Sequence, residues 1–186
     1  MINIVENFLH GRPSHNRITP SNGNAEASDR EIVMDKQGVA YDNELIDGLR
    51  QEHETLIEQF GFILKSGYEP GDLELLCENL GEFKRLFQSH LATENVKLFG
   101  YLEQKMKQHT PEVDLMLSFR REINECSKMV ISFCKKYARP IDALVLHDTF
   151  KDDYRDAGQA LIHRVQFIEK EMYSLYRNIY KVDFSL

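Results

Sequence analysis

Apolar residues recur at steps of three and four along four long segments of the chain, and this periodicity limits the fold more than any other feature. Such steps bring the apolar side chains of a segment onto one face of an α-helix. The expected helices cover about residues 43–65, 72–107, 110–138 and 149–180, with a short helical connection over 141–147. Gly, Pro and capping residues separate the helices. No strand-type alternation competes with this pattern, so we predict an all-α fold.

Four amphipathic helices joined by short loops pack most simply as an up-down-up-down four-helix bundle. A chain of 186 residues can form one such domain, and we assign residues 43–186 to the bundle. Residues 1–42 form an N-terminal extension, or arm, that we expect to be partly flexible, because Pro, Ser, Asn, Gly and charged residues dominate positions 11–30. Within the arm, residues 32–34 are expected to dock on the bundle as a helical turn or an extended strand.

Charge and cysteine content restrict the kind of partner. A net charge of -7 argues against a nucleic-acid binder, which would concentrate Lys and Arg. Residues 1–12 have no basic n-region and no long apolar run, and no stretch approaches the roughly 18 apolar residues of a membrane span, so we expect a cytoplasmic protein without a membrane partner. The cysteines Cys77, Cys126 and Cys134 are expected to be reduced core residues. The partner is therefore expected to be another protein, with a homodimer as one option.

His90 and Glu94 place an imidazole and a carboxylate one helical turn apart on the buried face of the second helix. Residues four apart in a helix point the same way to within about 40°. Histidine and glutamate together suit iron, manganese or zinc. His53 lies in the middle of the apolar stripe of the first helix, which makes it a further candidate ligand. His90 and Glu94 would be half of a metal site; the alternative is that His53 and His90 are hydrogen-bonded core histidines.

Two stretches, LRQEHETLI at residues 49–57 and HLATENVKLF at residues 90–99, resemble the first two helices of the hemerythrin-like, or His-His-Glu cation-binding, family. The resemblance extends over about residues 43–180 in layout. It implies a four-helix bundle with a non-haem di-iron centre that binds dioxygen, senses redox state or nitric oxide, or handles iron. In the family pattern the first helix gives a His, the second His-x-x-x-Glu, the third a His, and the fourth His-x-x-x-Glu or a near variant.

The first two helices match this pattern through His53, His90 and Glu94, but the third does not. In the stretch REINE at residues 121–125, Ile123 stands where the family has its histidine. A branched hydrocarbon side chain cannot bind a metal ion. The resemblance therefore implies a di-iron centre that this chain cannot complete from its third helix.

The fourth helix is aligned by its apolar run, MYSL at residues 172–175, with the run LFGY at residues 98–101. This register puts Arg164 where the family has His and Ile168 where it has Glu. We expect the Arg164 guanidinium to enter the polar pocket and pair with Glu94, satisfying the charge that iron would neutralise. Both family ligands of the last helix are replaced on this register.

Other polar residues of the helices have simpler interpretations. His163 lies opposite the apolar line of the last helix, so the helical wheel argues against it as a ligand. His163 and Glu169 stay open as misplaced ligands if the protein does bind metal. We expect six glutamates to lie on the solvent-exposed faces of the helices: Glu52, Glu54, Glu122, Glu125, Glu169 and Glu171.

We predict a non-enzymatic regulatory or interaction protein of hemerythrin-like fold with an incomplete di-iron site, holding no cofactor or one metal ion. The alternative is a metal-binding protein that uses non-haem iron at His53, His90 and Glu94 to sense oxygen, nitric oxide or redox state. Residues 45–47 and 156–164 also resemble, more weakly, the Rsd/AlgQ anti-sigma regulators of bacteria. That resemblance implies an anti-sigma-type transcription regulator, a special case of the first prediction.

Overall fold

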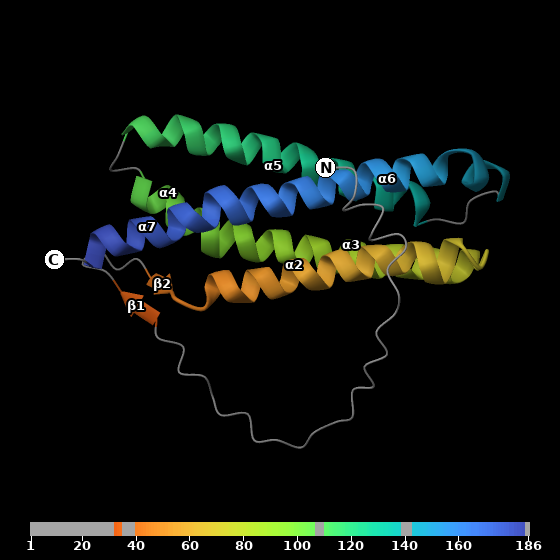
Figure 1. Cartoon of the computed structure of the whole chain (residues 1–186), viewed down its shortest axis with the longest axis horizontal. Coiled ribbons are helices and arrows are strands. Elements are labelled where there is room, and N and C mark those ends of the chain that lie inside the picture. Colours follow the sequence, from red (N-terminus) through yellow and green to blue (C-terminus); the bar gives the residue numbers. More distant parts are fainter. Residues whose placement is uncertain (1–31, 35–39, 107–109, 139–142, 185–186) are drawn as a thin grey trace, which may run out of the picture.

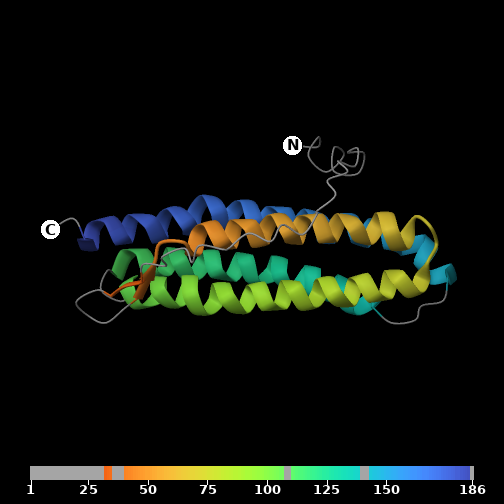
Figure 2. The same ribbon diagram turned by 90° about the horizontal axis from the view of Figure 1, so that it is seen from below.

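Four helical columns lie side by side along one axis in the structure, a computed structural model (Figure 1). It describes residues 32–34, 40–106, 110–138 and 143–184, with side chains over 41–106, 113–138 and 149–179. Successive columns run in opposite directions, and a view turned by 90° shows the same arrangement (Figure 2). This confirms the prediction of an all-α four-helix bundle.

Each column combines α-helical and π-helical segments or is a single α-helix. The first column is α2 (Leu45–Phe62) followed by η1 (Ile63–Tyr68), and the second is α3 (Leu73–Thr93), η2 (Glu94–Phe99) and α4 (Gly100–Met106). The third column is α5 (Thr110–Tyr137), and the fourth is α6 (Ala143–Phe167), η3 (Ile168–Met172) and α7 (Tyr173–Phe184). Contacts run from α2 to α3, α5, α6 and back to α2, which closes the bundle.

The described part of the arm is a β-hairpin. Strand β1 (Ile32–Met34) pairs antiparallel with β2 (Ala40–Asp42), so the extended alternative is the one observed for residues 32–34. Tyr176 of α7 holds the end of the hairpin, because its hydroxyl accepts from the Asp42 N–H at 3.1 Å and donates to the Asp42 carbonyl at 3.2 Å. Residues 1–31 and 35–39, and with them most of the expected flexible arm, lie outside the described residues.

Two expected boundaries are wrong in the structure. The short connection over 141–147 and a separate helix from Thr149 are in fact one helix, since α6 begins at Ala143 and continues unbroken. The reason is that no Pro or Gly occurs between residues 143 and 149 to stop the helix.

The expected 72–107 helix contains a π-helical segment at residues 94–99, and another π-helical segment follows α6 at Ile168. π-Helical turns inside α-helices are frequent at functional sites.

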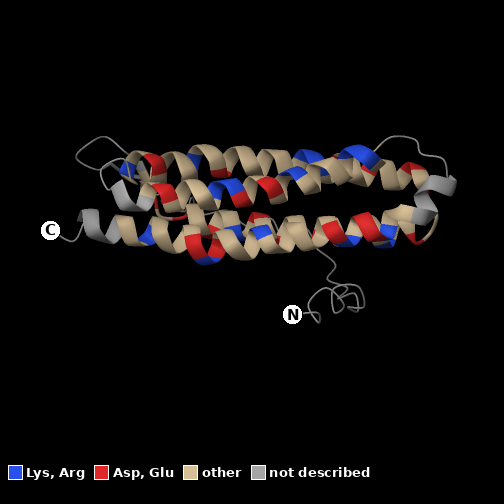
Figure 3. Ribbon diagram, turned by 90° about the horizontal axis from the view of Figure 1, so that it is seen from above, with Lys and Arg blue, Asp and Glu red and all other residues tan. Residues whose placement is uncertain are grey.

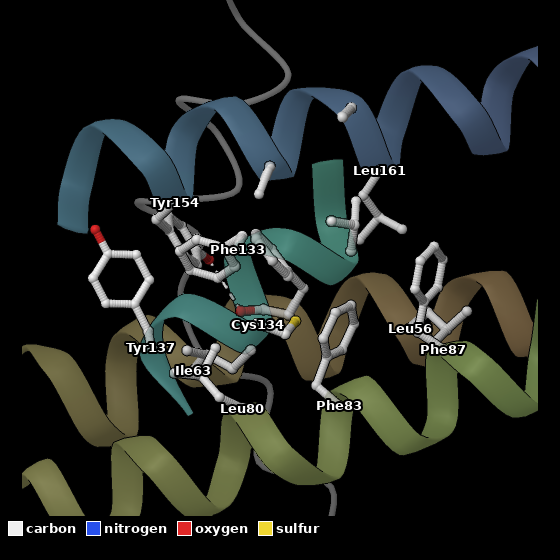
Figure 4. Close-up of a cluster of buried hydrophobic side chains, with 14 of the residues drawn as sticks. Leu56, Ile63, Leu80, Phe83, Phe87, Phe133, Cys134, Tyr137, Tyr154 and Leu161 are labelled. Carbon is white, nitrogen blue, oxygen red and sulfur yellow. Dashed lines mark hydrogen bonds between the residues drawn. The ribbon is translucent and has the colours of Figure 1, made fainter. Parts of the chain in front are cut away.

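Buried apolar side chains form two clusters along the bundle axis. One is rich in aromatic rings, among them Phe83, Phe133 and Tyr154 (Figure 4). In the same cluster Phe60 stacks on Tyr154, with ring centroids 4.6 Å apart. The other cluster contains Leu49, Leu98, Ile123, Ile168 and Tyr173. Among the buried polar residues of the described structure, His53, His90, Glu94 and Ser127 lie along the chain between members of the two clusters, and Arg164 lies next to Val165 at the end of the first.

Charged residues of both signs follow one another along the outer faces of the helices (Figure 3). None of the helices in the described part of the chain is long and apolar enough to cross a membrane. The three cysteines are free thiols, with Cys134 buried and Cys77 and Cys126 partly buried. Burial raises the pKa of the Cys134 thiol to about 12, which makes it an inert core residue at neutral pH.

Candidate metal centre

Five buried polar side chains meet between the two apolar clusters. Every column supplies at least one of them: His53 on α2, His90 and Glu94 on the second column, Ser127 on α5 and Arg164 on α6. The Glu94 carboxylate is completely excluded from solvent and lies at the centre of the group. A buried carboxylate is costly without compensating charge or hydrogen bonds.

The two oxygens of Glu94 have different surroundings. Oε1 lies 3.2 Å from His53 Nε2 and 3.1 Å from His90 Nε2. Oε2 accepts from the Nη2 of Arg164. The imidazole rings of His53 and His90 are themselves in edge-to-face contact, with centroids 4.7 Å apart. The histidines therefore converge on one oxygen, and the guanidinium holds the other.

Two outer carboxylates hold the far side of each imidazole. Glu169 Oε1 lies 2.8 Å from His53 Nδ1, and Glu52 Oε2 lies 2.7 Å from His90 Nδ1. Both glutamates are partly exposed, but their interpretation as simply solvated residues is wrong, because each contacts a buried histidine. A carboxylate hydrogen-bonded to the second ring nitrogen is the usual support of a metal-binding histidine.

These contacts determine which ring nitrogens carry protons. A carboxylate only accepts, so Glu169 and Glu52 require a proton on each Nδ1. With Nδ1 protonated, Nε2 carries a lone pair in the neutral imidazole and a second N–H in the imidazolium. The neutral ring is the form that can bind a metal ion, whereas a protonated Nε2 donates to Glu94 Oε1. His90 Nε2 makes no hydrogen bond within the described structure, although it is buried. With both rings neutral, the two Nε2 atoms and Glu94 Oε1 can act together as ligands of a metal ion.

Arg164 is fixed on the opposite side of Glu94. Its Nε donates to Ser127 Oγ at 2.9 Å, and the Ser127 hydroxyl donates to the Ile123 carbonyl at 2.9 Å. The guanidinium carbon also lies 5.7 Å from the centre of the Phe87 ring. The side chain thus points into the bundle, as the register of the last helix requires, and pairs with Glu94.

The pKa of Glu94 reflects this environment. Burial acts first and opposes ionisation, but the charge of Arg164 and the contacts with His53 and His90 outweigh it. Together they hold the pKa of the Glu94 carboxyl well below its ordinary value. Glu94 is therefore ionised at neutral pH, which is the form that can bind a cation.

Four other residues singled out from the sequence do not join this group as ligands. Ile123 and Ile168 are buried in the second apolar cluster, where they offer only hydrocarbon. His163 is exposed, and its Nε2 lies 2.9 Å from Glu122 Oε1 on the surface. Glu169, the other open alternative, reaches the group only through His53 Nδ1.

The geometry of His53, His90 and Glu94 suits one metal ion. Their ligand atoms all lie within 4.8 Å of one another. Atoms that share one ion at about 2.1 Å are separated by roughly 3.0 to 3.4 Å, and the two Nε2–Oε1 distances fall in this range. Two histidines and one carboxylate are the ligand set of many non-haem iron sites. A second ion does not fit, because Arg164 occupies Oε2 and the facing positions are isoleucines.

Comparison with known proteins agrees with the fold and the site. Residues 44–176 match the family described as Hemerythrin HHE cation binding domain. The chain belongs to this hemerythrin HHE family, which confirms the resemblance seen in its first two helices. Neither the curated proteins nor the solved structures contain a match to it.

Sequence reasoning missed the supporting residues of the site. Glu52 precedes His53 in the chain but contacts His90 of the neighbouring helix, so no motif within one helix reveals the pair. Ser127 lies one turn after Ile123 on α5, and that spacing from the replaced ligand is the signal that could have identified it.

Proposed function

We propose that this protein is a regulatory member of the hemerythrin HHE family that binds one transition-metal ion, with iron as the first candidate. His53 Nε2, His90 Nε2 and Glu94 Oε1 would hold the ion. One observation carries the proposal: the Glu94 carboxylate divides between two histidines on one oxygen and Arg164 on the other. A di-iron centre would need both oxygens of Glu94 for metal, whereas here the Arg164 guanidinium binds Oε2.

The metal would supply open coordination positions for a small ligand such as dioxygen or nitric oxide, because three protein ligands leave part of its shell free. The protein residues have separate tasks. Glu52 and Glu169 orient the imidazoles and increase their basicity. Arg164 balances the charge of Glu94 and keeps the site to one ion.

We further propose that the protein is not an enzyme and that its output is a contact with another protein. The three ligand residues are almost fully buried, which favours a small ligand over a larger substrate. On α5, Leu115, Leu117 and Met129 are about half exposed and offer apolar area to a partner. An anti-sigma role remains a special case of this proposal.

Metal analysis of the purified protein tests the proposal. The protein is loaded with Fe²⁺ without oxygen, freed of excess metal and measured by elemental analysis. We expect one ion per chain, lost in His90→Ala and in Glu94→Ala. His163→Ala is the matched control, because it removes an exposed histidine outside the site and should keep the ion. Two ions per chain, or none in the wild type, would contradict the proposal.

A further inference from the structure

An open groove of about 460 Å³ between α2 and α3 reaches the candidate metal centre from the surface. Its lining includes Gly48 and Glu52 of α2 and Leu86, Ser89 and His90 of α3. The ligand atoms themselves are buried. The groove therefore connects solvent with one of the histidines that would hold the metal.

Glu52 is the residue of this groove that contacts both solvent and a candidate ligand. Its side chain is 48% exposed, while Oε2 lies 2.7 Å from the Nδ1 of the buried His90. Only one carboxylate oxygen is used in this contact, which leaves Oε1 for a cation. Carboxylate oxygens bind hydrated divalent cations readily, so Glu52 can bind an ion before the buried ligands do.

A second groove approaches the site from the other side of α3 but suits a cation less well. It has a volume of about 490 Å³, lies between α3 and α5, and reaches Ser127, which holds Arg164. Arg120, Arg121 and Lys128 line it, against the single carboxylate of Glu125. The excess of positive charge there repels a metal ion, whereas the α2–α3 groove leads past a carboxylate.

We propose that Glu52 is a transfer ligand: a divalent transition-metal ion binds first to the Glu52 carboxylate in the α2–α3 groove and then passes to His90 and Glu94. This inference rests on the proposed function, since it describes how the ion reaches that site. Glu169 provides the natural comparison. It supports His53 in the same way, but it does not line the groove, and Arg50 Nε lies 3.9 Å from its other oxygen.

The test measures rates of metal binding, with Co²⁺ alone as the probe because its visible absorption reports ligation. Stopped-flow mixing gives the rate of uptake, excess chelator gives the rate of removal, and elemental analysis gives the ions per chain at equilibrium. Two matched pairs of variants are compared. Glu52→Gln and Glu169→Gln each leave an amide oxygen to accept from the histidine, but only the first changes the groove.

The second pair of variants, Gly48→Leu and Gly81→Leu, adds a side chain to the surface of a helix. A Cβ at Gly48 or at Gly81 would meet no atom within 4 Å, so both helices accept a larger side chain. Gly48 lines the α2–α3 groove and Gly81 does not. We expect Gly48→Leu to slow uptake and removal by the same factor, with one ion per chain at equilibrium, and Gly81→Leu to leave both rates unchanged.

We expect Glu52→Gln to slow uptake about tenfold, the lower end of the effect of local charge on association. Glu169→Gln should slow uptake less, because it weakens the support of His53 without changing the groove. Equal slowing in the two glutamine variants would overturn the inference, because the effect would then come from histidine orientation. Wild-type rates in Gly48→Leu and Glu52→Gln would also overturn it, while leaving the metal site intact. A wild-type protein that binds no Co²⁺ would overturn both this inference and the proposed function.

Discussion

Removing the Arg164 guanidinium should reveal how much free energy it costs to bury the Glu94 carboxylate without a partner. Arg164→Met keeps an unbranched apolar stem but removes the guanidinium. Arg164 and its partner Glu94 are each at most 2% exposed. Breaking a buried ion pair by removing one partner costs about 3–5 kcal/mol, because the other charge stays buried without compensation. The lost hydrogen bond from Arg164 to Ser127 adds about 1 kcal/mol. The metal-free variant should therefore lose about 4–6 kcal/mol of unfolding free energy.

Urea unfolding of the metal-free protein at pH 7 measures this loss through the transition midpoint. Arg177→Met is the control, because the contact of Arg177 with Asp47 at 3.4 Å is exposed on both sides and should change stability by less than about 1 kcal/mol. In the double variant of Glu94→Gln and Arg164→Met no lone charge is left, so its cost should fall short of the sum of the single costs by about 2 kcal/mol. Strict additivity, or an Arg164→Met cost as small as that of the control, would refute the internal ion pair.

Three further outcomes follow from the structure. The pKa of Glu94 is lower in the folded than in the unfolded chain, so ionised Glu94 stabilises the fold above its ordinary pKa of 4.5 and this stabilisation is lost as the pH falls below 4.5. The urea midpoint of the metal-free wild type should therefore drop more steeply between about pH 6 and 3 than that of Glu94→Gln. Gly67→Ala should destabilise by about 1–3 kcal/mol, because its Cβ would lie 2.6 Å from the Leu76 Cα, whereas Gly48→Ala should stabilise by up to about 1 kcal/mol in the same unfolding assay. Phe87→Ala should cost about 3–5 kcal/mol in thermal or urea unfolding, because the ring is fully buried; a loss below about 1 kcal/mol would contradict the packing.

Much of the fold could be predicted because helical periodicity is a local property of the sequence. The apolar stripes of the four segments identify the buried face of each helix, and burial of those faces leaves a bundle as the simplest packing. The helical wheel placed His163 on the outer face, as the structure has it. Alignment of the last helix with the second, on the family pattern, placed Arg164 inside the bundle, where it is buried.

Contacts between helices could not be predicted in this way. The pairs Glu52–His90 and Glu169–His53 depend on the rotation and spacing of neighbouring columns. Glu94 and Ile168 each begin a π-helical segment, which changes the angular position of the residues that follow, and no sequence signal used here indicates such a turn. The support of the site therefore emerges only from the assembled bundle.

The number and position of bound metal ions test the central claim most directly. Crystals of the protein loaded with Fe²⁺ without oxygen, measured at the iron absorption edge, would locate every ion by its anomalous signal. The account predicts one peak per chain, between His53 Nε2, His90 Nε2 and Glu94 Oε1, with Arg164 still bound to Glu94 Oε2. Two peaks bridged by Glu94 with Arg164 displaced, or no peak at this position, would contradict it.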